Sequence, residues 1–219
     1  MVKLQTFNLD GDTMPINRTF FLSQAKLTLF DGAISASQKA GLTAILDKWE
    51  AEMPQADDRW LAYMLGTAHH ETGRTMQAVR ETFASSDDQA IARLNRAFNA
   101  GRLPWVSQPY WHKDGAGKSW LGRGLVQITH KANYQKLGQL IGVDLVADPG
   151  QAMSLPVAIK IMFTGMTKGS FTGKKLGDFF AGPRSDWRNA RRIINGVERA
   201  DLVASYARQY YGAISYTTG

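Results

Sequence analysis

The feature that most limits the possible folds is a series of helix-start and helix-stop signals along the chain. The segment 35–53 offers Ser35 or Ser37 as an N-cap, carries apolar residues at helical spacing, and is followed by Pro54, which cannot continue a helix. Similar helical segments are expected at 57–73, 85–101 and 154–169, with a pair of helices in 185–214 that is broken at Asn195-Gly196. The chain is therefore predicted to be mainly α-helical.

The stretch between Gly101 and Gly124 interrupts this pattern, because it is rich in glycine, proline and aromatic residues and has no sustained period. We expect a loop there, with at most a short hairpin. With residues before it, this stretch is predicted to form a smaller lobe at roughly 84–121, within one domain that spans 1–219.

Composition excludes several classes of protein. The chain has no cysteine, so disulfide scaffolds, thiolate zinc sites and cysteine nucleophiles are excluded. Its net charge of +7 favours a polyanionic partner, whether nucleic acid, an anionic membrane or an anionic cell envelope. No apolar run approaches the roughly 18 residues of a membrane span. The N-terminus lacks the apolar core of a signal peptide, so we expect synthesis and folding in the cytosol.

Two stretches resemble ligand-binding motifs, but each lacks a residue that the motif requires. The stretch 112–119 ends like a phosphate-binding loop, but His112 stands where that loop requires glycine. The stretch around His70 resembles a zinc-protease helix, yet Arg74 stands where the second histidine would be needed. We therefore expect neither a nucleotide site nor a metal site.

Glu71 is the first candidate for catalysis. On a helix it shares a face with Leu61, Met64 and Ala68, so it should be partly desolvated. It also falls in the last turn, where the helix dipole disfavours negative charge. Both effects should raise its pKa and suit it to protonate a leaving group. The alternative is that Glu71 simply reaches solvent at a frayed helix end.

Glu81 is the second candidate, ten positions further along the chain. It lies outside the helix, so it should be solvated and ionised, and two carboxylates in different environments can divide acid and base roles. In an inverting glycosidase such a pair stands roughly 6.5–9.5 Å apart, with a water between. The alternative is a surface residue paired with Arg80. Nearby aromatic side chains could cover the C–H faces of sugar rings or form a small core beneath the loop, namely Trp105, Tyr110, Trp111 and Trp120.

Three motifs in order resemble the family-19 chitinase-like glycoside hydrolases: AHHETG at 68–73, GRGLVQITHKANY at 122–134 and NARRIING at 189–196. The stretches VRETF, FTGKKLGDFF and DWRNARRIINGVERADLVASYARQYY are closer to the phage endolysin branch of that family. The resemblance runs from about residue 30 to the C-terminus. It implies a lysozyme-like, two-lobed helical fold with a small lobe rich in loops and hairpins.

The resemblance also implies roles for individual residues. Glu71 would be the general acid, Glu81 the general base, and Thr129 would help to hold the attacking water. Four more side chains are implied to lie along the substrate or beside the acid, namely His70, Gln127, Asn133 and Asn195. No metal and no cofactor is implied.

The sequence departs from plant-type chitinases in ways that bear on the substrate. The interval between the two glutamates is shorter, and Ala132 stands near a position where those enzymes have tyrosine. Both departures fit an endolysin that cuts the β-1,4 bonds of peptidoglycan. We expect such a monomer to stay in the host cytoplasm until a separate pore releases it, and to dock to the anionic envelope by charge, without nucleic acid or membrane insertion.

Three alternatives remain open at this point. The chain could be a chitinase of the same fold, or a lytic transglycosylase that uses a single acid. It could also be a basic, non-catalytic protein that binds cell wall or nucleic acid. The sequence leaves open the host, which of the two β-1,4 linkages is cut, and residual activity on chitin.

Overall fold

The structure is a computed structural model that describes residues 14–216, and it is mainly α-helical, as predicted. The helices are α1 (Arg18–Leu29), α2 (Ala36–Glu52), α3 (Asp58–Glu71), α4 (Asp87–Asn99), α5 (Lys131–Ile141), α6 (Leu155–Lys168) and α7 (Ala200–Ala213). None of these helices is long and apolar enough to cross a membrane. Residues 1–13, where no signal peptide is recognised, lie outside the described part of the chain.

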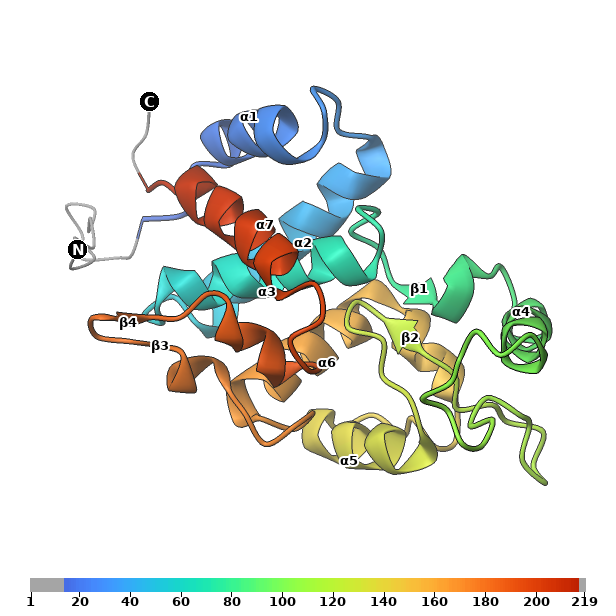
Figure 1. Cartoon of the computed structure of the whole chain (residues 1–219). Helices are drawn as coiled ribbons and strands as arrows, with labels where there is room; N and C mark the ends of the chain where they lie inside the picture. Colours follow the sequence, from blue (N-terminus) through green and yellow to red (C-terminus); the bar gives the residue numbers. More distant parts are fainter. Residues whose placement is uncertain (1–13, 217–219) are drawn as a thin grey trace.

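The remaining elements are short. Two antiparallel ladders are formed by β1 (Val79–Arg80) with β2 (Arg123–Gly124), and by β3 (Phe180–Ala181) with β4 (Arg184–Ser185). Four 3-10 helices complete the order, η1 (Glu81–Phe83), η2 (Pro149–Met153), η3 (Leu176–Asp178) and η4 (Asn189–Ile193). The β1–β2 ladder joins the turn after α3 to the GRG sequence, and Figure 1 shows it between the main group of helices and α4.

Capping explains where the predicted helices begin and end. Ser35 caps α2 in a capping box with Gln38, and Ser86 accepts a hydrogen bond from a backbone N–H in the first turn of α4. Gly169 ends α6 in the left-handed conformation that glycine adopts without strain. The bounds expected for α2, α3, α4 and α6 are confirmed to within two residues.

Three elements differ from the sequence-based expectation. The first helix of the predicted C-terminal pair is only the 3-10 segment η4, although the chain does leave the helical conformation around Asn195-Gly196 as predicted. Helix α1 is not among the predicted helices, although the side chain of Asn17 caps it. Helix α5 is not predicted either. It begins after His130, which has a positive φ of 66° and makes no side-chain cap hydrogen bond. A helix with no capping residue gives no start signal in the sequence.

Helix α3 lies at the centre of the main core. Nine consecutive residues, Leu61–His69, are buried, so α3 is covered on all sides rather than on one face. Its most extensive contacts are with α7, which lies across it in Figure 1. The two backbones approach closely at Gly66, where an added Cβ would lie 2.7 Å from the backbone nitrogen of Ala207. Helix α7 therefore fixes the helix that ends at Glu71.

A second, smaller core lies beside α4, which stands apart from the other helices in Figure 1. It consists of the buried residues Ala84, Ala90, Leu94, Trp111 and Leu121. These residues come from the segment for which the sequence predicts a smaller lobe. The main core and this second core flank the β1–β2 ladder, which carries the chain into Glu81.

The buried His69 predicts a loss of stability in acid. Its Nδ1 lies 3.0 Å from the hydroxyl of Tyr210, its Nε2 has no hydrogen-bond partner within residues 14–216, and burial lowers its pKa to about 4. The unfolded chain binds a proton at about pH 6.5, so the free energy of unfolding should fall as the pH drops from about 6.5 to 4. The loss attributable to this histidine should be of the order of 3 kcal/mol.

Denaturant unfolding of the wild type and of His69→Gln at several pH values measures this effect. The wild type should lose about 2–3 kcal/mol more than the variant between pH 7 and pH 4. Parallel pH dependence in the two proteins would show that His69 is not the responsible group.

Candidate active site

Glu71 is the last residue of α3, and its side chain is largely buried at 16% exposure. Leu61, Met64 and Ala68 on the same face are fully buried, as predicted. Its Oε1 accepts a hydrogen bond of 2.5 Å from Nη1 of Arg191, whose side chain is only 5% exposed. The guanidinium therefore forms a largely buried ion pair with the carboxylate.

The sequence pattern does not predict Arg191 as a partner of Glu71. The arrangement occupies Oε1 and leaves Oε2 without a partner within residues 14–216. Glu71 thus has one oxygen fixed and one oxygen available for another molecule.

His70 lies next to Glu71 and is half-buried. Burial lowers its pKa, and the neighbouring Glu71 carboxylate acts in the opposite direction. Its interaction with Glu71 is electrostatic, because the imidazole of His70 makes no hydrogen bond within residues 14–216. Orientation of Glu71 by His70 stays a prediction.

Glu81 is held by three hydrogen bonds at the start of η1. Its backbone N–H donates to the carbonyl of Gly122 at 2.7 Å, and the N–H of Gly122 donates to Oε2 at 2.8 Å. The hydroxyl of Tyr110 donates to Oε1 at 2.6 Å. Both carboxylate oxygens of Glu81 are therefore held by hydrogen bonds. Burial, followed by the nearby Glu81 carboxylate, raises the pKa of Tyr110, which remains a proton donor.

The environment of Glu81 therefore differs from the simple solvated position that the sequence suggested. The residue is half-buried, and its partners are neutral donors. The alternative pairing with Arg80 is not formed, because Nε of Arg80 donates to Asp87 at 2.8 Å.

A strained turn follows Glu81 and lies against the turn after Glu71. Thr82 and Phe83 both have positive φ, 61° and 54°, which is uncommon for residues with side chains and is costly for β-branched threonine. A Cβ added to Gly73 would lie 3.0 Å from the ring of Phe83. The two glutamates thus belong to turns that are in contact.

Gly122 and Gln127, both in the GRGLVQ sequence, help to position Glu81. Gln127 donates from Nε2 to the carbonyls of Val79 at 2.9 Å and Gly124 at 3.0 Å. At Gly122, an added Cβ would lie 2.8 Å from Oε1 of Gln127 and 3.3 Å from Oε2 of Glu81. Gln127, predicted to contact substrate, is therefore engaged in supporting this turn.

Replacing Gly122 by alanine should lower kcat by about a hundredfold, because the added methyl group would displace Glu81 or Gln127 and weaken the support of Glu81. Circular dichroism and the melting temperature check that the helices persist. Gly115 is a matched control, since nothing lies within 4 Å of a Cβ added there. Full activity of Gly122→Ala would show that this close contact is unimportant.

The other predicted site residues, Thr129, Asn133 and Asn195, do not all lie together. Nδ2 of Asn133 donates to the carbonyl of Thr129 at 2.8 Å, so these two are in direct contact. Asn195 is exposed, and its Oδ1 accepts from the N–H of Gly196 at 2.8 Å. Within residues 14–216, no hydrogen bond joins Asn195 to either glutamate. Its role on the substrate stays a prediction.

The four aromatic residues divide between packing and exposure. Trp111 is fully buried in the second core and Trp120 is buried in the main core, so neither can cover a sugar ring. Trp105 is 76% exposed. Tyr110 alone among the four contacts a candidate catalytic side chain.

Arg123 was not predicted as part of the site. Its side chain is fully buried, forms an ion pair with Asp87, and donates to the hydroxyl of Tyr134 at 2.8 Å and the carbonyl of Ser119 at 3.1 Å. It thereby links α4, the loop and α5 around the strand that supports Glu81. Within the described chain, no three histidine or acidic side chains gather as metal ligands.

Comparison with known proteins identifies the family of the chain. Residues 35–170, more than half of the chain, match the glycoside hydrolase family 19, described as class I chitinases. The chain belongs to this family and is a glycoside hydrolase.

Two solved structures are similar over most of their length. Chitinase C from Streptomyces griseus HUT6037 has 19% identity and a TM-score of 0.48, covering 89% of this chain and 92% of the other. A bacterial family 19 chitinase has 20% identity and a TM-score of 0.38, covering 86% and 93%.

Proposed function

We propose that this protein is an endolysin-type hydrolase, acting as one catalytic domain, that cleaves the β-1,4 glycosidic bond of peptidoglycan with inversion. The observation that carries this proposal is the pair of glutamates on two contacting turns, each with its own set of partners. Membership of the glycoside hydrolase family supports the reaction type.

In the proposed mechanism, Glu71 protonates the oxygen that leaves and Glu81 removes a proton from water. Transfer of the proton leaves Glu71 as an anion beside Arg191, which stabilises the charge that develops there. Glu81 accepts one proton from the water that attacks the sugar from the opposite face, and Thr129 helps to hold that water. One C–O bond breaks and one forms, so no cofactor is required.

Three features favour peptidoglycan over chitin. Ala132 replaces the tyrosine expected for plant-type chitinases, the two glutamates are close in sequence, and the net charge of +7 suits an anionic envelope. The proposal includes accumulation in the host cytoplasm, release through a separate pore, and action as a monomer.

Mass spectrometry of the products from purified peptidoglycan in heavy-oxygen water tests the proposal. We expect reducing-end fragments that carry one heavy oxygen, and the fragment ends identify which linkage is cut. Anhydro ends would instead indicate a lytic transglycosylase. Turnover of soluble chitin oligomers with no release from peptidoglycan would indicate a chitinase, and binding to the wall without any cleavage would indicate a non-catalytic protein.

A further inference from the structure

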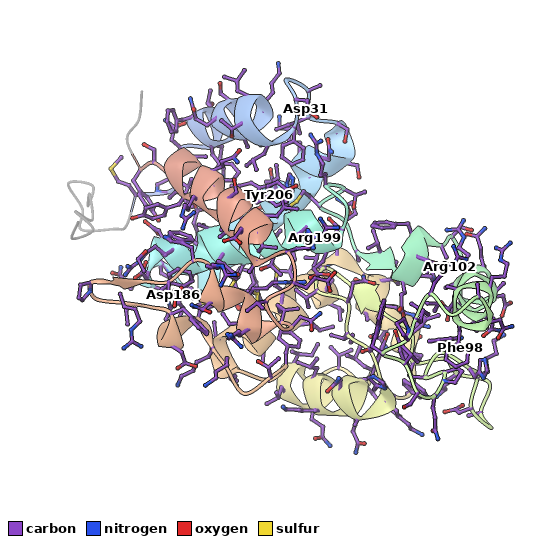
Figure 2. All side chains as sticks on the ribbon, viewed as in Figure 1. Asp31, Phe98, Arg102, Asp186, Arg199 and Tyr206 are labelled. Carbon is purple, nitrogen blue, oxygen red and sulfur yellow. The ribbon has the colours of Figure 1, made fainter. Side chains whose placement is uncertain are left out.

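An arginine-lined hollow lies against the second half of α4 and the residues that follow it. Arg93, Arg96, Ala97 and Arg102 surround an open space of about 520 Å³, here called the basic hollow. Figure 2 labels Arg102 beside α4, close to Phe98, on the side of the molecule that carries the second core.

The basic hollow has no counter-charge of its own. Within residues 14–216, the guanidinium groups of Arg96 and Arg102 make no ion pair or hydrogen bond. The two acids at the start of α4 are engaged elsewhere, since Asp87 pairs with Arg80 and Arg123 while Asp88 pairs with a lysine. An uncompensated arginine cluster of this kind favours an anion.

Arg93 connects the basic hollow to the candidate active site. Its Nη1 donates to the carbonyl of Thr82 at 2.7 Å and to that of Phe83 at 3.3 Å. These are the two strained residues that follow Glu81. The side chain of Arg93 therefore contacts the turn after Glu81 and also lines the basic hollow. A substrate bound at Glu81 could extend into the basic hollow.

We propose that the basic hollow binds a carboxylate of the peptide stems of the same peptidoglycan strand that the enzyme cuts. This rests on the proposed function. Peptidoglycan carries free carboxylates on its peptides, whereas chitin is an uncharged polymer, so the hollow selects for the former. Guanidinium groups bind carboxylates through two parallel hydrogen bonds, which gives geometric specificity as well as attraction.

The test compares Arg96→Gln/Arg102→Gln with the wild type on purified peptidoglycan, before and after its carboxylates are converted to amides. Arg93 stays unchanged because it holds the turn after Glu81. On intact peptidoglycan the variant should show KM raised about five- to tenfold, with kcat little changed. Amidation should raise the KM of the wild type by a similar factor and leave the variant unaffected.

Lys26→Gln/Lys39→Gln is the control, because it removes the same charge from a different exposed hollow near α1. It should behave as the wild type. The proposal is overturned if the KM of the arginine variant on intact peptidoglycan equals that of the wild type. It is also overturned if the variant's KM exceeds the wild-type KM by the same factor on intact and amidated peptidoglycan, or if the lysine variant shows as large a rise in KM on intact peptidoglycan.

Failure of the proposed function would give a different result. In that case the wild type would release no fragments from intact peptidoglycan. Cosedimentation of the wild type and the arginine variant with intact and amidated peptidoglycan then tests the basic hollow alone. Binding that is insensitive to both changes would overturn it.

Discussion

Replacing Glu71 by glutamine should lower the rate of peptidoglycan hydrolysis by about a thousandfold with little change in KM. Glutamine keeps the shape of the side chain but cannot give a proton to the leaving oxygen. It also removes the negative charge that faces the buried guanidinium of Arg191, so some stability should be lost. Initial rates of reducing-end release measure the effect, and the melting temperature shows that the variant is folded at the assay temperature.

Glu52→Gln provides the control for this variant. Glu52 is an exposed residue of α2 that pairs with Lys48 four residues earlier. Its replacement should leave the rate unchanged and cost little stability. A Glu71→Gln enzyme within tenfold of the wild type would remove Glu71 from the role of general acid.

Replacing Glu81 by glutamine should lower the rate by about a hundredfold or more, because the attacking water loses its base. The neutral amide also cannot accept hydrogen bonds from both Tyr110 and Gly122 as the carboxylate does. Rates and products should be measured together. Near-full activity with anhydro products would point to a lytic transglycosylase that needs a single acid.

Tyr110→Phe separates the chemistry of Glu81 from its positioning. This variant keeps the carboxylate and removes only the hydroxyl that donates to Oε1. Its rate should fall by about tenfold, well short of the Glu81→Gln effect. Equal losses in the two variants would indicate that Glu81 acts through its packing rather than as a base.

Most helices could be predicted because their signals are local. Ser35, Ser86 and Gly169 act within one turn of their own positions, so their patterns survive in any tertiary context. Helix α5 ends at Gly142 in the same left-handed conformation as α6 does at Gly169, but its start has no capping side chain, and it is stabilised by burying Tyr134 and Leu137. A helix whose start depends on tertiary packing gives no local signal for where it begins.

The candidate site shows the same difference between local signals, which the sequence reveals, and distant contacts, which it does not. The sequence motifs propose Glu71 and Glu81 as candidates, and helical spacing places Glu71 on a buried face. Their partners could not be predicted, because Arg191 is 120 positions from Glu71 and Tyr110 is 29 positions from Glu81. Arg191 does lie within the NARRIING motif, in which the family resemblance implies a role for Asn195 alone.

The aromatic residues show why composition alone misleads about a binding surface. Trp111 and Trp120 have the same local appearance in sequence as Trp105, yet the first two are buried and the third is exposed. Which ring is covered depends on how the loop folds onto α4 and α5. That arrangement is set by distant contacts such as those of Arg123.

The close approach of α3 and α7 at Gly66 bears on enzyme engineering. Residues 35–170 match the family, but α7 and Arg191 lie beyond that segment. A chimaera that transplanted only the matched segment would leave the central helix uncovered and the proposed acid without its cation. The smallest transferable unit should therefore run through Ala213, and exchanges of the C-terminal helix between relatives should succeed only where a small residue faces it.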